Sequence, residues 1–173
     1  MLVLASVSPR RSALLTQLGM PHRVIPAHID ERRHDGEPIE QCVRRLAVQK
    51  ALQVSAMLQA AGTLDQRQAV LGADTTVVLD QYMLEKPRDR QHGLAMLARL
   101  SGREHEVLSA VALAYGGRLQ TLLSRSLVRL RSLVARNARH TGTAVSRTIR
   151  RAAMPSRDAA PCSSSHCMAA IRV

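Results

Sequence analysis

The feature that most constrains this fold is an apolar run of eleven residues, Ala69–Leu79, which carries a single carboxylate, Asp74, near its middle. Its Val and Thr residues, followed by the turn residues Asp80 and Gln81, predict a buried β-strand. A carboxylate inside such a strand is costly to bury unless it is paired or bound to a metal. Asp74 is therefore a candidate cation ligand or general base for water, although a strand-end Asp that makes turn hydrogen bonds fits the same pattern.

The rest of residues 1–133 alternates strands with helices, which is typical of the α/β class. Gly116 and Gly117 predict a hairpin turn. Expected strands cover residues 2–5, 22–26, 82–84, 106–114 and 119–133, and expected helices cover residues 9–18, 38–61 and 88–100. With 173 residues and a hydrophobic content of 46%, the chain can bury a core in one domain, or in two small lobes around one cleft.

The charge is divided unevenly along the sequence. Residues 1–133 hold 18 basic side chains against 12 acidic ones, whereas residues 134–173 hold seven Arg and one acid, Asp158. This shift predicts a domain at 1–133 and a basic tail at 134–173. The tail is compatible with a nucleic-acid arm, but two Tyr and no Phe or Trp argue against a protein that stacks on single-stranded bases.

The apolar segments, the N-terminus and the cysteines indicate the cellular compartment of the protein. No segment reaches the roughly 18 consecutive apolar residues of a membrane span, and the N-terminus lacks the regions of a signal peptide. Three Cys at irregular spacing predict no disulfide framework, and Cys162 and Cys167 lack the second ligand pair of a zinc site. We therefore expect a cytoplasmic protein.

The segment between the first strand and the first helix is a candidate phosphate site. Ser8 can cap the helix, Pro9 fits its first position, and Arg10 and Arg11 follow. The backbone N–H groups and the positive dipole end of a helix start, together with two guanidinium groups, suit phosphates. A capped helix with two solvated arginines is the simpler alternative.

Lys50 and Lys86 are the only lysines in an arginine-rich chain. A lysine is a compact charge suited to a phosphate, although two ordinary surface lysines would look the same. Asp30 and Glu31 add two carboxylates. Carboxylates and cations around a phosphate site are what metal-assisted hydrolysis of a phosphoanhydride requires.

These clusters, in this order, resemble the Maf family of nucleoside triphosphate pyrophosphatases. The resembling stretches are residues 4–15, 29–31, 45–50, 72–80, 85–87 and 96–107. The resemblance implies a Maf/ITPase-like mixed sheet flanked by helices, with a cleft between two lobes. It also implies an enzyme that uses a divalent metal, Mg²⁺ or Mn²⁺, to split a nucleoside triphosphate into the monophosphate and pyrophosphate.

The resemblance also implies residue roles. Asp74 would accept the proton of the attacking water and bind the metal together with Glu31. Arg10 and Thr75 match positions that tune base choice, and the paired arginines look like the branch that acts on dTTP and UTP. The side chains implied in substrate binding are Ser6, Arg10, Arg11, Lys50, Thr75 and Lys86.

The resemblance stops near residue 133. The family continues with a D-K-A-G segment and an I-Q-G segment, which are absent here, but the next reading frame over codons 134–158 permits both. Our hypothesis is that residues from about 134 onward are a frameshifted translation of a Maf gene. It predicts an incomplete second lobe, a poorly ordered tail at 134–173, and impaired stability and activity.

Two functions fit these sequence features. The favoured one is a nucleotide pyrophosphatase whose partner is a nucleoside triphosphate, without membrane or specific nucleic-acid binding; a homodimer is left open. The alternative is a basic nucleic-acid-binding or regulatory protein, related to septum formation, that acts through residues 134–173. Pyrophosphate release that is lost in Asp74→Asn would support the first, and salt-sensitive duplex binding that is lost on truncation at residue 133 would support the second.

Overall fold

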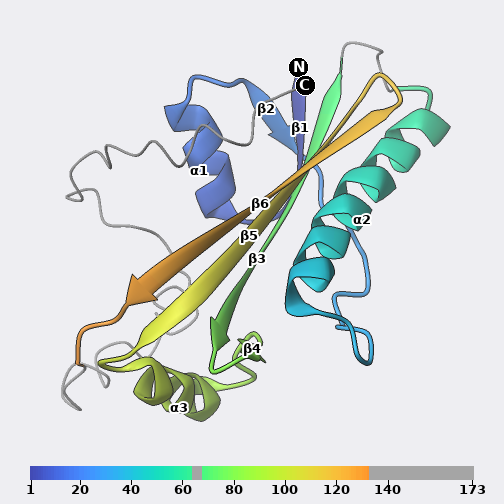
Figure 1. Ribbon diagram of the computed structural model, residues 1–173. Coiled ribbons are helices and arrows are strands. Elements are labelled where there is room, and N and C mark those ends of the chain that lie inside the picture. Colours follow the sequence, from blue (N-terminus) through green and yellow to red (C-terminus); the bar gives the residue numbers. More distant parts are fainter. Residues whose placement is uncertain (64–67, 133–173) are drawn as a thin grey trace, which may run out of the picture.

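A computed structural model describes residues 1–63 and 68–132 of the chain. They form a six-stranded mixed sheet in the order β2-β1-β3-β5-β6, with β4 beside β3 (Figure 1). The strands are β1 (Leu2–Ala5), β2 (His22–Val24), β3 (Ala69–Leu79), β4 (Tyr82–Leu84), β5 (Glu104–Tyr115) and β6 (Arg118–Arg129), and the helices are α1 (Pro9–Gln17), α2 (Ile39–Ala60) and α3 (Arg90–Leu100). A mixed sheet flanked by helices confirms the predicted α/β class. The poor order predicted for residues 134–173 falls outside the described residues.

Strand β3 is the centre of the sheet, as its apolar sequence predicts. It pairs in parallel with β1 over residues 69–72 and antiparallel with β5 over residues 70–78. Strand β1 ends opposite Gly72, and β4 pairs only with residues 77–79. Within the described part of the chain, residues 73–76 of β3 therefore have no strand partner on the β1 side, which leaves an opening between β1 and β4.

Helix α2 covers one face of β3 and β5 (Figure 1). Its buried residues recur every three or four positions, from Cys42 to Leu58, which is the pattern of a helix with one apolar face. At the seam the packing uses small residues: Ala47 and Ala51 of α2 and Ala110 of β5 are all fully or almost fully buried. This close approach fixes α2 tightly against the sheet.

Helix α3 packs at the far end of β3. Met96, Leu97 and Leu100 bury their side chains against Val77 and neighbouring residues of the sheet. The sequence predicted that this helix begins at residue 88, but it begins at Arg90. The Asp89 carboxylate accepts a hydrogen bond from the His92 backbone N–H at 2.7 Å and caps the helix there.

Two tight turns join the antiparallel strands where the sequence predicts them. Asp80 and Gln81 have φ values of 51° and 66°, and Gly116 and Gly117 have φ values of 55° and 73°. Two consecutive positive φ angles are typical of type I′ hairpin turns, whose twist matches that of the strands. Both predicted turns are confirmed.

The last hairpin differs from the prediction in its length. Strand β5 extends beyond residues 106–114 at both ends because its ladder with β6 runs from Glu104 to Tyr115. Strand β6 begins at Arg118 and ends at Arg129, so the predicted end at residue 133 was wrong.

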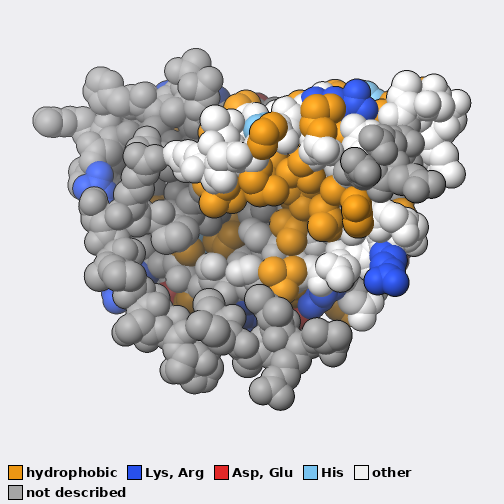
Figure 2. All heavy atoms as spheres, turned by 90° about the horizontal axis from the view of Figure 1, so that it is seen from above, with side chains coloured by type: hydrophobic (Ala, Val, Ile, Leu, Met, Phe, Trp, Pro, Cys, Tyr) orange, Lys and Arg blue, Asp and Glu red, His pale blue; other side chains and the backbone are white. Residues whose placement is uncertain are grey.

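Figure 2 views the molecule from above and shows apolar side chains gathered over a broad area of that face. In the part of the chain that the structure describes, no helix is long and apolar enough to cross a membrane.

Candidate active site

A cavity of about 570 Å³ lies beyond the end of β1, where β3 pairs with β5 but has no strand partner on the β1 side among the described residues. Its wall combines the loop after β1, the start of α1, the middle of β3 and the segment after β4. All the residues to which the family resemblance gives a role line this one cavity: Ser6, Arg10, Arg11, Glu31, Lys50, Asp74, Thr75 and Lys86. Residues from five separate parts of the sequence thus meet in one place. Asp30 does not join them, because its carboxylate binds the Arg32 guanidinium at 2.7 Å.

The start of α1 forms one side of the cavity. Ser8 is the N-cap residue and Pro9 is the first helical residue, as predicted. The Ser8 side chain, however, makes no capping hydrogen bond; instead the Ser8 backbone N–H donates to Ser6 Oγ at 3.3 Å. Ser8 lies in the cavity wall together with Arg10 and Arg11. The helix therefore presents its positive end to the cavity.

Arg11 connects α1 to β1 and β3. Its Nη1 donates to Ser6 Oγ at 3.0 Å, and its Nη2 donates to Thr75 Oγ1 at 3.1 Å. Thr75 Oγ1 in turn lies 3.1 Å from Ser109 Oγ of β5. The alternative of a solvated arginine is wrong for Arg11, because two hydroxyl groups, Ser6 in the loop after β1 and Thr75 on β3, hold its guanidinium in place.

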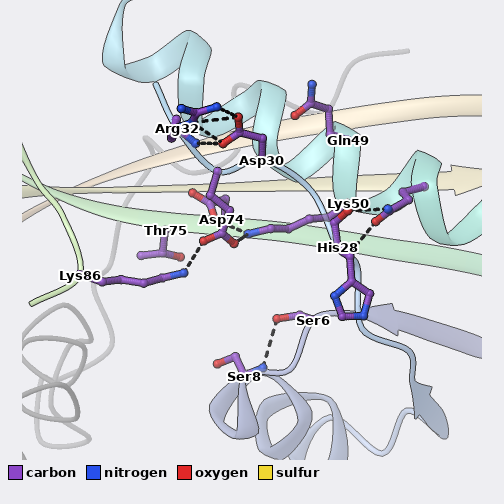
Figure 3. A network of polar contacts seen from close by, with 12 residues as sticks. Ser6, Ser8, His28, Asp30, Arg32, Gln49, Lys50, Asp74, Thr75 and Lys86 are labelled. Atoms are coloured by element: carbon purple, nitrogen blue, oxygen red, sulfur yellow. Dashed lines mark hydrogen bonds and ion pairs between the residues drawn. The ribbon is translucent and has the colours of Figure 1, made fainter. Parts of the chain in front are cut away.

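Lys50 joins the two candidate metal ligands, Glu31 and Asp74, and Figure 3 shows its ammonium group pointing toward Asp74. Its Nζ lies 2.7 Å from Asp74 Oδ1 and 2.8 Å from Glu31 Oε1, and its side chain is only 9% exposed. Lys86 reaches the other oxygen of Glu31 from the opposite side and is 69% exposed. Asp74 therefore lies in mid-strand and pairs with a buried lysine, so the interpretation of Asp74 as a strand-end turn residue was wrong, as was that of Lys50 as a surface lysine.

Two lysines dominate the electrostatics of Glu31. Burial raises the pKa of Glu31, but hydrogen bonds from Lys50 and Lys86 outweigh burial and lower that pKa to about 2. Glu31 is therefore ionised at neutral pH. A permanent carboxylate beside an exposed ammonium group can hold a cation or a charged ligand without a change of protonation.

The donor set limits the kind of metal site that fits. Over residues 1–63 and 68–132, no group of three or more His, Cys, Asp or Glu side chains is placed to hold a metal ion. Glu31 and Asp74 offer two carboxylates that approach the same ammonium group. Mg²⁺ commonly binds through one or two carboxylates while phosphates and water complete its shell. The residues present therefore fit a cation that is shared with a phosphate ligand.

Ser109 and Ser126 also line the cavity, and the sequence analysis missed both. They lie on β5 and β6, far in sequence from the other residues of the site. The register that places Ser109 opposite Thr75 could not be read from the sequence, because it depends on how the strands pair. A Ser in the middle of an apolar strand was the available signal.

A comparison with known protein families identifies the family of this chain. The model of the family described as "Maf-like protein" matches residues 1–148. The chain belongs to the Maf family. The predicted family resemblance is thus confirmed, and it covers most of the chain.

Several curated Maf-related proteins are similar in sequence. A dTTP/UTP pyrophosphatase of Bordetella pertussis is 48% identical over 136 residues, which are 76% of this chain and 65% of the relative. Proteins with the same name from Myxococcus xanthus (48% identity; 77% of this chain, 64% of the relative) and Yersinia pestis (47% identity; 65% of this chain, 54% of the relative) also match. The chain spans at most about 65% of the length of these relatives.

Proposed function

We propose that this chain is a nucleoside triphosphate pyrophosphatase that acts on dTTP and UTP. The observation that supports the proposal is the meeting of Arg10, Arg11, Lys86, Glu31 and Asp74 in one cavity. Cations of this kind bind phosphates, and carboxylates bind the metal and accept protons. The name shared by the relatives supports the choice of dTTP and UTP as substrates.

In this proposal the cations of the cavity hold the triphosphate. The start of α1 with Arg10 and Arg11 contacts phosphate oxygens, and Lys86 contacts them from the segment after β4. Water supplies the oxygen that replaces the bridging oxygen of the α–β phosphoanhydride bond. Asp74 accepts the proton of that water, and pyrophosphate departs with the bridging oxygen. Lys50 keeps the Asp74 carboxylate oriented through their 2.7 Å ion pair.

Glu31 and Asp74 would hold a divalent cation, Mg²⁺ or Mn²⁺, together with the substrate phosphates. Such a cation neutralises the charge that builds up on the phosphate oxygens during hydrolysis. Substrates of this class belong to nucleotide metabolism, so we place the activity in the cytoplasm.

Pyrophosphate release from dTTP and UTP in the presence of Mg²⁺ or Mn²⁺ tests the proposal. We expect Asp74→Asn to lower the rate by at least about a hundredfold, because a positioned general base contributes that much or more. Asp80→Asn is the matched control: Asp80 lies in the β3–β4 turn, pairs with Arg103 at 2.7 Å and is not among the residues that line the cavity. Equal rates above the background without protein, for Asp74→Asn and the unaltered chain, would refute the role of Asp74.

We also propose that residues 1–133 are the pyrophosphatase domain and that residues from about 134 onward are encoded out of frame. The curated relatives align with at most 136 residues of this chain, which fits this division, whereas the family match continues to residue 148. The coding DNA across codons 130–173 tests it. If the next frame does not encode the D-K-A-G and I-Q-G segments, the frameshift hypothesis is wrong. If it does, a chain with the frame restored should release pyrophosphate faster than this one.

A further inference from the structure

A row of hydroxyl groups crosses the floor of the cavity. Thr75 of β3 and Ser109 of β5 are direct partners in the antiparallel ladder, so their side chains lie on the same face of the sheet. Their oxygens lie 3.1 Å apart, which is hydrogen-bonding distance. Both side chains line the cavity. Ser109 is therefore fixed to Thr75 by register as well as by a hydrogen bond.

Thr75 is also the point at which β3 holds Arg11. A guanidinium can only donate, so Thr75 Oγ1 must offer a lone pair to Arg11 Nη2, which lies 3.1 Å away. A hydroxyl has one proton and two lone pairs, and its proton rotates to suit its neighbours. A bond to Ser109 restricts that rotation. The lone pair that Arg11 needs is then kept in the right direction.

The other end of the guanidinium is held in the same manner. Arg11 Nη1 donates to Ser6 Oγ at 3.0 Å, and Ser6 Oγ also accepts the Ser8 N–H. The hydrogen bonds thus run from Ser109 through Thr75 and Arg11 to Ser6, across β5, β3, α1 and the loop after β1. A change at Ser109 can therefore reach the phosphate end of the cavity through Thr75 and Arg11.

We propose that Ser109 is a positioning residue for nucleotide binding, which acts through Thr75 to hold the Arg11 guanidinium toward the phosphates. This inference rests on the proposed function. Ser109 itself needs no contact with the reacting atoms. Ser124 is the matched control, because it lies directly opposite Ser109 on β6 but is not among the residues that line the cavity.

Isothermal titration of the full chain with the α,β-imido analogue of dUTP and Mg²⁺ tests the proposal, because the analogue binds without being split. We expect Ser109→Ala to weaken binding about fivefold, the loss that corresponds to one hydrogen bond. Ser109→Thr, which keeps the hydroxyl, should restore the affinity of the unaltered chain. Ser124→Ala should bind as the unaltered chain does.

A double-mutant cycle tests the route through Thr75. If Ser109 acts through that residue, Ser109→Ala should cause no further loss in a Thr75→Val chain. Fully additive losses, or a Ser109→Ala chain that binds as tightly as the unaltered one, would overturn the inference while the proposed function stands. Failure of the unaltered chain to bind the analogue would instead overturn the proposed function, and this inference with it.

Discussion

Gly72 is the position at which one added methyl group should do most harm. A Cβ atom placed there would lie 2.2 Å from the Ala47 carbonyl oxygen and 2.6 Å from the Ala51 backbone nitrogen, whereas ordinary contacts begin near 3.4 Å. Both obstacles belong to the backbone of α2, so no side-chain rotation can relieve the clash. In Gly72→Ala the helix must therefore retreat from β3 by more than an ångström.

The retreat has two costs. Overpacking of a core costs about 1–3 kcal/mol and occasionally more, and a clash with helix backbone belongs at the upper end, so we expect a loss of about 3 kcal/mol or more. For a chain of this size that corresponds to a fall in Tm of about 6–12 °C. Lys50 lies on α2 between Ala47 and Ala51, so its 2.7 Å contact with Asp74 should also break.

Thermal unfolding followed by circular dichroism measures the loss of stability. Titration with the imido analogue measures how far the loss of the contact between Lys50 and Asp74 weakens nucleotide binding. Gly116→Ala is the control: it adds the same methyl group at a φ of 55° with no atom within 4 Å, so only backbone strain of about 1–2 kcal/mol should result. Nucleotide binding should survive in this control. A Gly72→Ala chain that melts within about 2 °C of the parent would refute the close packing of α2.

Three further predictions concern titration and turn strain. Burial lowers the pKa of His105 from 6.5, so the unfolded chain binds more protons than the folded one. The free energy of unfolding should therefore fall as the pH drops below about 6.5. Urea unfolding at several pH values should show a smaller pH dependence of this free energy in His105→Leu. Lys86→Ala removes one of the two lysines that lower the pKa of Glu31, so that pKa should rise above about 2 in a carboxyl-carbon NMR titration; an unchanged value would contradict the ion pair. Gln81→Gly should raise the Tm by about 2–4 °C, because Gln81 has a φ of 66° and glycine removes roughly 1 kcal/mol of strain; a lower Tm would show that the Gln81 side chain stabilises the turn.

The residues that line the cavity could be predicted in part from local sequence and in part from the family resemblance. Three local patterns indicated candidate residues: an apolar strand with one carboxylate, a strand followed by a Pro-Arg-Arg helix start, and two lysines in an arginine-rich chain. Burying the Asp74 carboxylate in mid-strand costs free energy, and its ion pair with the buried Lys50 offsets that cost. Local turn chemistry likewise located the turns at Asp80 and at Gly116.

What the sequence could not supply depends on contacts between distant segments. The burial of Lys50 follows from the seam of small residues that brings α2 against β3, and no local pattern reports that seam. The bond between Thr75 and Ser109 follows from strand register, which 33 intervening residues do not reveal. The ends of β5 and β6 were missed because ladder pairing extended β5 beyond its weak alternation of apolar residues.

The proposed function requires that the cavity between the start of α1 and Lys86 holds a nucleoside triphosphate. The most direct measurement is a crystal structure of the full chain with the imido analogue of dUTP and Mn²⁺, in which anomalous scattering locates the manganese. We predict phosphate density against Ser6, Arg11 and Lys86, and a manganese peak beside Glu31 and Asp74. Nucleotide bound elsewhere on the chain, with only solvent in this cavity, would contradict the account.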